Sequence, residues 1–395
     1  MASDTLLVAG GRVLRPDMQV READVLVDRD AGCIEAVGPD LDAGYSPDVR
    51  LDAAGGLVLP GLVNAHTHVA MTLLRGYADD KPLETWLQDD IWPAEAALTP
   101  EDVRAGADLG ILEMIRSGTT AFADMYFHME QVADAVEQAG LRARVGNGAV
   151  TVGKDNADAR ADVEESIAVA REFDGAADGR VRTAVMPHSL TTVSESLLRE
   201  AAAAARDNGI PVHFHANETE DEVDPIVEER SMRPLSYADD AGLLSSADFL
   251  AHAVHVDRSE IDRLADTGAA VVHCPASNMK LASGMAPVQE LLDAGVTVAL
   301  GTDGAASNND LDLFDELRDA AIVGKLAADD AAAVPAAAAV RMATRGGAAV
   351  LSLPGGRIEA GAAAAFAAVD LDAPHPPPQH DLVSLFQTRD RTLWI

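Results

Sequence analysis

Apolar residues gather in eight short runs after the first 55 residues, and segments with helical periodicity separate most of them. Runs that are apolar on both faces are typical of parallel strands, because helices cover such sheets on both sides. Glycines stand before several runs, where helix C-caps belong. The runs are Gly56–His68, Thr119–Tyr126, Arg142–Val150, Val181–His188, Pro211–Glu218, Phe249–His255, Ala269–Pro275 and Val296–Asp303.

Eightfold alternation of strand and helix predicts an α/β fold, a (β/α)8 barrel of TIM type over residues 56–349. Residues 1–55 and 350–395 differ, because they hold shorter strand-like pieces such as Thr5–Ala9 and Ala365–Asp370. We expect both ends of the chain to form one small β-sandwich domain. The expected helices include Pro100–Ser117, Gln131–Ala139, Ala161–Phe173, Ser194–Asn208, Arg258–Asp266 and Pro287–Asp293.

Ionisable residues fall at the C-terminal ends of these strands, the face that carries the active site in such barrels. His66 and His68 share one face of their strand, because alternate side chains point the same way. Together with His215 and Asp303 they offer three imidazoles and a carboxylate, which suit Zn²⁺ and would also accept Fe²⁺ or Mn²⁺. A site for two metal ions would need a bridging lysine at the end of the fourth strand, where this chain has His188. We therefore expect one divalent ion per subunit.

Two further residues are candidates for catalysis. Glu218 lies three residues beyond His215 and can carry a proton from water to the substrate; the alternative is a surface carboxylate in an acidic run. His252 can polarise the water; the alternative is a histidine hydrogen-bonded at a strand end. We interpret three further histidines as structural residues without a catalytic role: His213, His255 and His273.

Charge restricts the choice of partners. The 395 residues include 65 acids and 30 bases, a formal net charge of -35, and the acids are spread along the chain. An apolar content of 48% excludes a disordered acidic tail. Nucleic acid and anionic membranes would be repelled. The sequence contains no uncharged apolar run of about 18 residues, so we expect no membrane span. The N-terminus shows no pattern of a cleavable signal.

Only two cysteines occur, Cys33 and Cys274, which favours a reducing compartment over a disulfide scaffold. We therefore expect a cytoplasmic protein of a high-salt cell, where salt screens the self-repulsion of so many acids. We also expect a homo-oligomer, either a dimer or a tetramer.

Four segments, in this order, are similar to the motifs of the amidohydrolase superfamily: Pro60–His68, His213–Glu218, Ala251–His255 and Gly301–Asn309. Within it, the chain resembles the 5′-methylthioadenosine/S-adenosylhomocysteine deaminases in Leu74–Asp80, Trp86–Glu95 and Cys274–Leu281. The resemblance implies an aminohydrolase that removes the 6-amino group of an adenosine-type nucleoside, giving the inosine analogue and ammonia.

The resemblance also implies roles for individual residues. Glu218 passes a proton of the attacking water to N1, His252 supports the attacking oxygen, and Asp303 takes the remaining proton and helps to deliver it to the leaving amine. Glu95 holds the ribose diol, since a carboxylate accepts two hydrogen bonds, and His188 contacts the substrate.

The chain departs from the family's pattern after the third strand, and also after the fourth, where Ser189-Leu190-Thr191 stands in place of Ser-Pro-Tyr. Asn147 stands where the family carries an arginine after the third strand, and Arg160 in the following loop is a candidate to take its place. Two other functions remain open: a related hydrolase that acts on guanine, cytosine or a chlorinated triazine, and a non-catalytic barrel. The complete ligand set argues against the second, and Glu95 argues against a substrate without ribose.

Salt dependence tests the interpretation of the charge. We expect the midpoint of thermal unfolding and the catalytic rate to rise as KCl increases from dilute buffer to molar concentration, because the Debye length falls to about 3 Å at 1 M. Circular dichroism and an activity assay along a KCl series measure both. Equal stability and activity at the two ends of the series would contradict a salt-adapted protein.

Overall fold

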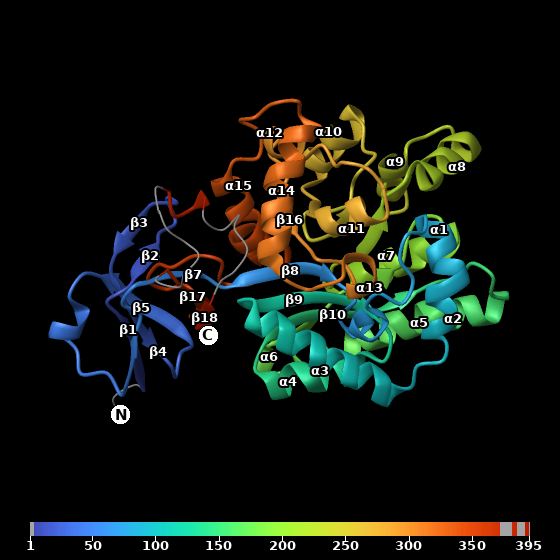
Figure 1. Ribbon diagram of the computed structural model, residues 1–395. Coiled ribbons are helices and arrows are strands. Elements are labelled where there is room, and N and C mark those ends of the chain that lie inside the picture. Colours follow the sequence, from blue (N-terminus) through green and yellow to red (C-terminus); the bar gives the residue numbers. More distant parts are fainter. Residues whose placement is uncertain (1–3, 372–380, 385–391, 395) are drawn as a thin grey trace.

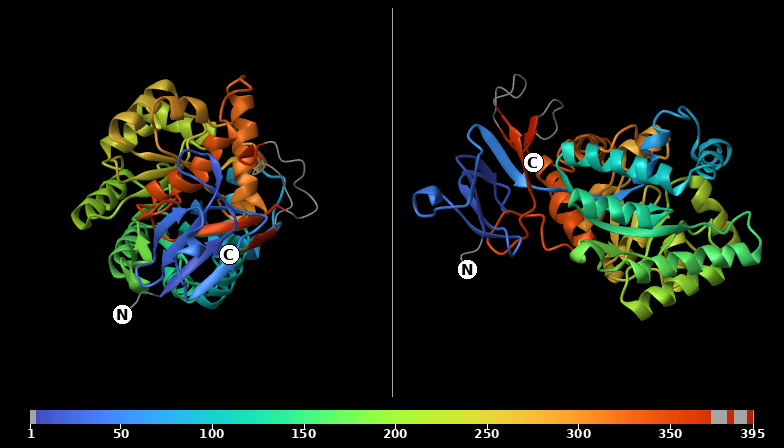
Figure 2. Two further views of the ribbon diagram at one scale, coloured as in Figure 1. Left: turned by 90° about the vertical axis from the view of Figure 1, so that its left-hand side faces the viewer. Right: turned by 90° about the horizontal axis from the view of Figure 1, so that it is seen from below.

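The computed structural model describes residues 4–371, 381–384 and 392–394. Figure 1 shows two parts: strands from both ends of the chain lie on one side, and alternating strands and helices lie on the other. The same division is visible in the right-hand view of Figure 2. None of the described helices is long and apolar enough to cross a membrane.

Parallel strands form the centre of the α/β part. One sheet has the order β11-β10-β9-β8, with β12 also on β10, and the other has the order β13-β14-β15-β16. Strands that follow one another in the chain pair in parallel, since the intervening helix returns the chain to the same edge. The strands are β8 (Leu62–Thr67), β9 (Thr119–Tyr126), β10 (Arg142–Ala149), β11 (Val181–Thr183), β12 (Met186–Pro187), β13 (His213–Ala216), β14 (Phe249–His252), β15 (Ala270–His273) and β16 (Val298–Leu300).

Backbone contacts link the two sheets at both edges. A parallel bridge joins Val185, beside β12, to Val212, beside β13. At the other edge, the backbone N–H of Asp303 donates to the carbonyl oxygen of His66 at 3.1 Å. The ends of β16 and β8 therefore lie together. The sequence likewise predicts that His68, which follows β8, lies near Asp303, which follows β16.

Helices surround the strands, and their ends follow the local sequence. Thr99 and Asp102 form a capping box at the start of α3, and α4 ends at Gly140, whose φ of 78° is left-handed. The helical segments are η2 (Val69–Leu74), α1 (Leu83–Thr85), η3 (Trp86–Ile91), α2 (Trp92–Glu95), α3 (Pro100–Arg116), α4 (Met129–Ala139), α5 (Asn156–Glu172), α6 (Ala176–Gly179), α7 (Glu195–Asn208), α8 (Glu220–Arg230), α9 (Pro234–Asp240), α10 (Arg258–Thr267), α11 (Pro275–Lys280), α12 (Val288–Asp293), α13 (Ala305–Asn308), α14 (Leu313–Ala327), α15 (Ala336–Arg341), η4 (Met342–Gly346) and α16 (Gly347–Val350).

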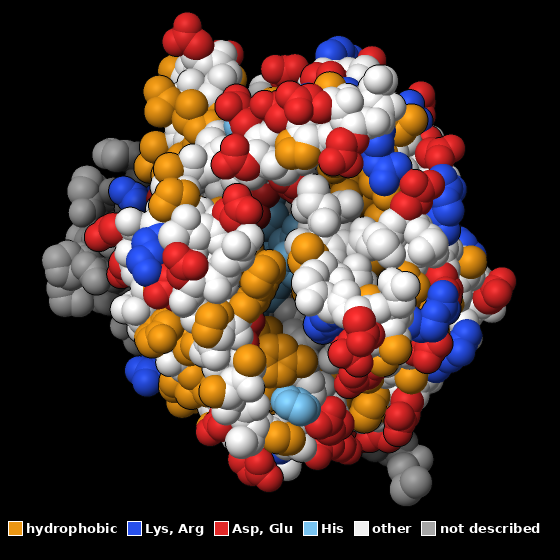
Figure 3. All heavy atoms as spheres, turned by 90° about the vertical axis from the view of Figure 1, so that its right-hand side faces the viewer, with side chains coloured by type: hydrophobic (Ala, Val, Ile, Leu, Met, Phe, Trp, Pro, Cys, Tyr) orange, Lys and Arg blue, Asp and Glu red, His pale blue; other side chains and the backbone are white. Residues whose placement is uncertain are grey.

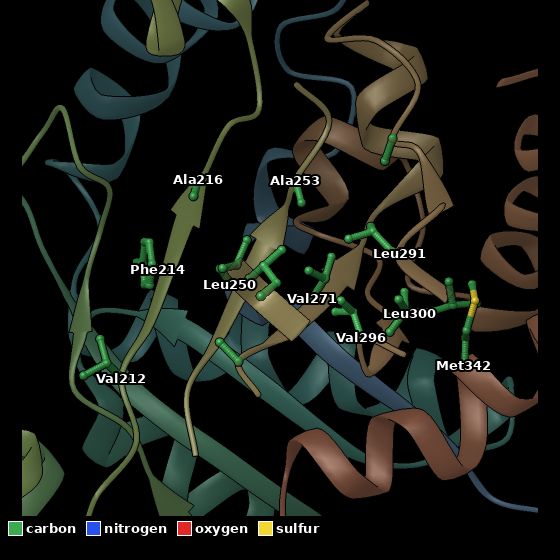
Figure 4. Packing of buried hydrophobic residues seen from close by; sticks show 14 of the residues in the cluster. Val212, Phe214, Ala216, Leu250, Ala253, Val271, Leu291, Val296, Leu300 and Met342 are labelled. Carbon is green, nitrogen blue, oxygen red and sulfur yellow. The ribbon is translucent and has the colours of Figure 1, made fainter. Parts of the chain in front are cut away.

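The largest apolar cluster lies between strands and helices. Phe214, Leu250 and Val271 come from three neighbouring strands and are fully buried. Figure 4 shows them with Leu291 and Met342, which come from helical segments beyond the strands. Burial of each such side chain contributes about 1.5–3 kcal/mol, so this packing holds β13, β14 and β15 in register beneath their polar ends.

Strands from both chain ends form two further sheets, with the orders β5-β4-β1-β6 and β18-β17-β7-β2-β3. The antiparallel pairing of β17 with β7 brings the C-terminal end of the chain beside the N-terminal end. The strands are β1 (Thr5–Ala9), β2 (Arg12–Leu14), β3 (Val20–Glu22), β4 (Asp24–Asp28), β5 (Cys33–Gly38), β6 (Val49–Asp52), β7 (Gly56–Pro60), β17 (Phe366–Asp370) and β18 (Thr392–Trp394), with the turn η1 (Leu41–Ala43) between β5 and β6.

The prediction of one strand over Gly56–His68 is wrong. The structure divides this run into β7, which belongs to a terminal sheet, and β8, which belongs to the α/β part. The break lies at Gly61, where a Cβ atom would stand 2.2 Å from Oγ1 of Thr120. The run is apolar throughout because it is buried on both sides of the break, so the sequence pattern gives no sign of the change of partner.

Candidate metal centre and its cavity

The predicted site residues converge at the C-terminal ends of the parallel strands. His66 lies in β8, His215 in β13 and His252 at the end of β14, while Asp303 follows β16. These four residues are buried, and each offers a ligand atom within 4.8 Å of the other three. His68 directly follows β8, and its Nε2 lies 3.1 Å from Oδ1 of Asp303. Five side chains from the ends of four strands thus lie close together.

Two serines fix the carboxylate of Asp303. The hydroxyl groups of Ser277 and Ser307 both donate to Oδ2, at 2.6 and 2.9 Å. The other oxygen, Oδ1, faces the imidazoles, 3.4 Å from Nε2 of His66. The φ of Asp303 is 59° and that of His252 is 76°, and such left-handed backbone in residues other than glycine gathers at functional sites.

Backbone carbonyl groups fix two of the imidazoles. Nδ1 of His68 lies 2.5 Å from the oxygen of Met125, and Nδ1 of His215 lies 2.7 Å from the oxygen of His188. A carbonyl oxygen only accepts, so each Nδ1 carries a proton, and Nε2 is the nitrogen of each ring that a metal ion could bind. Both Nε2 atoms are therefore prepared as ligands.

A second histidine, His213, determines which nitrogen of His66 carries the proton. Nδ1 of His213 lies 3.0 Å from the oxygen of Phe249, and Nε2 of His213 lies 2.8 Å from Nδ1 of His66. His213 donates to the carbonyl group and accepts from His66, which leaves a lone pair on Nε2 of His66. That Nε2 is buried without a hydrogen-bond partner among the described residues. A cation between the imidazoles and Asp303 would satisfy it, so the donor set fits a metal ion.

Glu218 lies beside this cluster and is buried. Its Oε1 accepts a hydrogen bond of 3.1 Å from Ser283, and its Oε2 lies 3.5 Å from Nε2 of His252. Its backbone N–H donates to the carboxylate of Glu222 at 2.9 Å. Burial raises the pKa of Glu218 to about 8. A carboxyl group with such a pKa can both accept and release a proton near neutral pH.

The cluster forms the floor of a cavity of about 1180 Å³ that is open to solvent. Figure 3 looks into this hollow from the side that faces away from the terminal sheets, with histidine inside and acidic side chains on the rim. Glu95 and His188 line it, as the sequence predicts for substrate contacts, and burial raises the pKa of Glu95. Trp86, Leu87 and Trp92 form an apolar wall of the cavity.

Two predicted substrate contacts are not brought to the cavity. Asn147 is buried in β10 and is not among the lining residues. Arg160 lies on α5 and donates two hydrogen bonds, of 2.9 and 2.7 Å, to the carboxylate of exposed Glu200. Arg160 points away from the cavity because it lies on the face of α5 that packs against α7. The sequence alone does not show which face that is.

Sequence reasoning missed the residues that hold the ligands in place. Ser307 lies within the superfamily segment Gly301–Asn309 and Ser277 within the deaminase-like segment Cys274–Leu281, and that placement was the only available signal. His213, interpreted from the sequence as structural, supports the ring of His66 and is not one of the four clustered residues. Its position two residues before His215 was the sign that both rings face the same side of β13.

Comparison with known proteins extends these observations. Over 382 residues the chain is 69% identical to 5-methylthioadenosine/S-adenosylhomocysteine deaminase of the halophilic archaeon Halobacterium salinarum, covering 97% of this chain and 88% of the relative. It is 44% identical to 5′-deoxyadenosine deaminase of Methanothermobacter thermautotrophicus, covering 97% and 90%.

Among solved structures, the adenosine deaminase of Xanthomonas campestris, which has bound zinc, matches with a TM-score of 0.91 and 39% identity over 99% of this chain and 91% of that one. The fold is thus of the TIM-barrel type found in such enzymes. Residues 57–393 match the description of the amidohydrolase family, and the buried histidine–aspartate cluster lies within them. The chain belongs to the amidohydrolase family.

Proposed function

We propose that the protein is a metal-dependent deaminase that replaces the 6-amino group of an adenosine-type nucleoside with oxygen and releases ammonia. The observation that carries this proposal is the buried cluster at the floor of a cavity of about 1180 Å³, with Glu218 at the cluster and Glu95 on the wall. The names of the relatives support the same reaction.

The lone pairs support His66, His68 and His215 as imidazole ligands, with Oδ1 of Asp303 as the fourth. Three neutral imidazoles and a carboxylate suit one zinc ion, and would also accept Fe²⁺ or Mn²⁺. When bound, such an ion acts as a Lewis acid and lowers the pKa of water toward neutrality. The serines on Oδ2 of Asp303 keep the other oxygen directed at the imidazoles.

His252 differs from the three ligands, although it is one of the four residues within 4.8 Å of one another. The amide nitrogen of Asn278 lies 2.9 Å from its Nδ1. An amide N–H only donates, so Nδ1 accepts and the proton of the neutral ring is on Nε2. His252 therefore presents a donor near Glu218, which suits a group that holds the attacking oxygen rather than a ligand.

Glu218 moves the first proton. It takes a proton from the attacking water and gives it to N1 of the purine, so that C6 becomes tetrahedral without charge building up on the ring. Asp303 takes the proton of the new hydroxyl group and returns it to the amine, which leaves as ammonia. Glu95 accepts hydrogen bonds from the two ribose hydroxyls, and His188 contacts the substrate beside His215.

We also infer that the parallel strands close into an eight-stranded barrel, with β11 and β12 together as one strand, and that residues 1–55 and 350–395 form one β-sandwich to which β7 belongs as well. The hydrogen bond from Asp303 to His66 and the bridge from Val185 to Val212 support closure. The pairing of β17 with β7 supports the composite domain. We expect a homo-oligomer in the cytoplasm of a high-salt cell.

Removal of the proton shuttle tests the mechanism. We expect Glu218→Gln to retain bound metal but to lose about 10²–10⁴-fold in kcat, because an amide cannot accept the proton. Asp303→Ala should lose both metal and activity. Ammonia release in concentrated KCl and elemental analysis of the purified variants measure the two properties. A near wild-type rate in Glu218→Gln would contradict the shuttle.

Glu95 tests the recognition of ribose. We expect Glu95→Ala to raise the KM for adenosine and 5′-methylthioadenosine by about tenfold with a smaller change in kcat, because loss of hydrogen bonds to a charged acceptor costs about 1.5–3 kcal/mol. Adenine, which has no ribose, is the matched control substrate. Equal turnover of adenine and adenosine by the wild-type protein would instead indicate a hydrolase that acts on free bases.

His213 tests the hydrogen-bonded route to His66. We expect His213→Leu to weaken metal binding about 10–100-fold, since hydrogen bonds to ligating histidines fix their tautomer. Competition with a chelator of known affinity measures this change. His128→Leu, on the surface beside Glu130, is the control and should bind metal as the wild type does. Equal affinity in the two variants would exclude a role for His213.

A further inference from the structure

We propose that the cavity selects substrates by the net charge of the 5′ substituent: neutral and cationic groups are accepted, and groups with a net negative charge are disfavoured. This proposal rests on the nucleoside deaminase function above. It concerns the outer half of the cavity, which a 5′ substituent must enter when the purine lies at the floor and the ribose lies beside Glu95.

The exposed residues that line the cavity include three acids. Glu220 and Asp221 at the start of α8 and Glu84 at α1 are exposed lining residues, and Glu222 is half-buried behind them. Among the described residues that line the cavity, none is a lysine or an arginine. Figure 3 shows acidic side chains near the opening of the hollow, mainly above it, with hydrophobic and uncharged side chains on much of the remaining rim.

The lysines that neighbour the cavity lining in the chain form ion pairs with aspartates. Three lysines lie next to lining residues in the chain, and each has an aspartate partner: Lys81 with Asp90, Lys154 with Asp162, and Lys280 with Asp79. Arg160, the candidate to replace the family's arginine, is held by Glu200 on the outside of α5 and α7. An incoming anion would have to share or displace an acidic partner to bind one of these four bases.

The energetic consequence follows from elementary electrostatics. Two like charges about 4 Å apart in water change an equilibrium constant by about fivefold, and a partly closed cavity increases the effect. A carboxylate at the rim also loses part of its hydration without gaining a cationic partner. S-adenosylhomocysteine carries both an ammonium and a carboxylate group, so the acids attract one end and repel the other, and it should fall between a cationic and an anionic analogue.

Four thioethers of adenosine test the proposal on the wild-type protein. They are 5′-methylthioadenosine (neutral), the 3-aminopropyl thioether (cationic), S-adenosylhomocysteine (zwitterionic) and the 3-carboxypropyl thioether (anionic). We expect kcat/KM to be at least about tenfold lower for the anionic than for the cationic compound of equal chain length. The assay uses the lowest KCl concentration at which circular dichroism shows a folded protein, because salt screens the effect.

A pair of variants locates the source of the discrimination. The double variant Glu220→Gln/Asp221→Asn removes two charges from the rim and should reduce the difference between the cationic and anionic compounds about threefold or more. Its control, Glu228→Gln/Glu229→Gln, removes two exposed charges from the same helix outside the cavity and should leave the difference unchanged.

Each outcome has one meaning. Equal kcat/KM for all four thioethers in the wild type overturns the selection by charge but leaves the deaminase function intact. Equal discrimination in the rim and control variants also overturns the proposal, because it removes the rim acids as the cause. Absence of ammonia release from every adenosine compound defeats the proposed function itself.

Discussion

The position of Asp303 is the constraint on which both the strand array and the site depend. Its backbone N–H binds the carbonyl oxygen of His66, which joins the end of β16 to β8. Its carboxylate is held by Ser277 and Ser307 on one oxygen and faces the imidazoles with the other. The left-handed backbone at this residue is the conformational cost of serving both purposes. One residue therefore both links the two parallel sheets and places a carboxylate in the histidine cluster.

Much of the α/β part is predictable because burial leaves a direct mark on the sequence. Thr119–Tyr126 coincides with β9, and Pro100–Ser117 extends one residue beyond α3. Apolar runs between helices define parallel strands, and glycines mark the helix ends. The division of Gly56–His68 could not be predicted, since a strand buried on both faces shows the same pattern whichever sheet it joins.

The positions of the site residues were more predictable than their chemical states. Strand ends bring His66, His68, His215 and Asp303 together in any fold of this type, so their spacing is informative. Their tautomers depend on carbonyl groups and side chains from other strands, such as the oxygen of Met125 and the ring of His213. Arg160 failed as a substrate contact for the same reason: its partner, Glu200, comes from a helix elsewhere in the chain.

The single glycine between β7 and β8 has a mechanical meaning. The polypeptide passes from a terminal sheet into the strand that bears His66 within one residue, with no flexible linker between them. Within the β-rich part, β7 pairs with β2 and β17. This pairing fixes the point at which β8 begins. Excision of that part would leave the start of β8 held by its pairing with β9 but without the support of the terminal sheet.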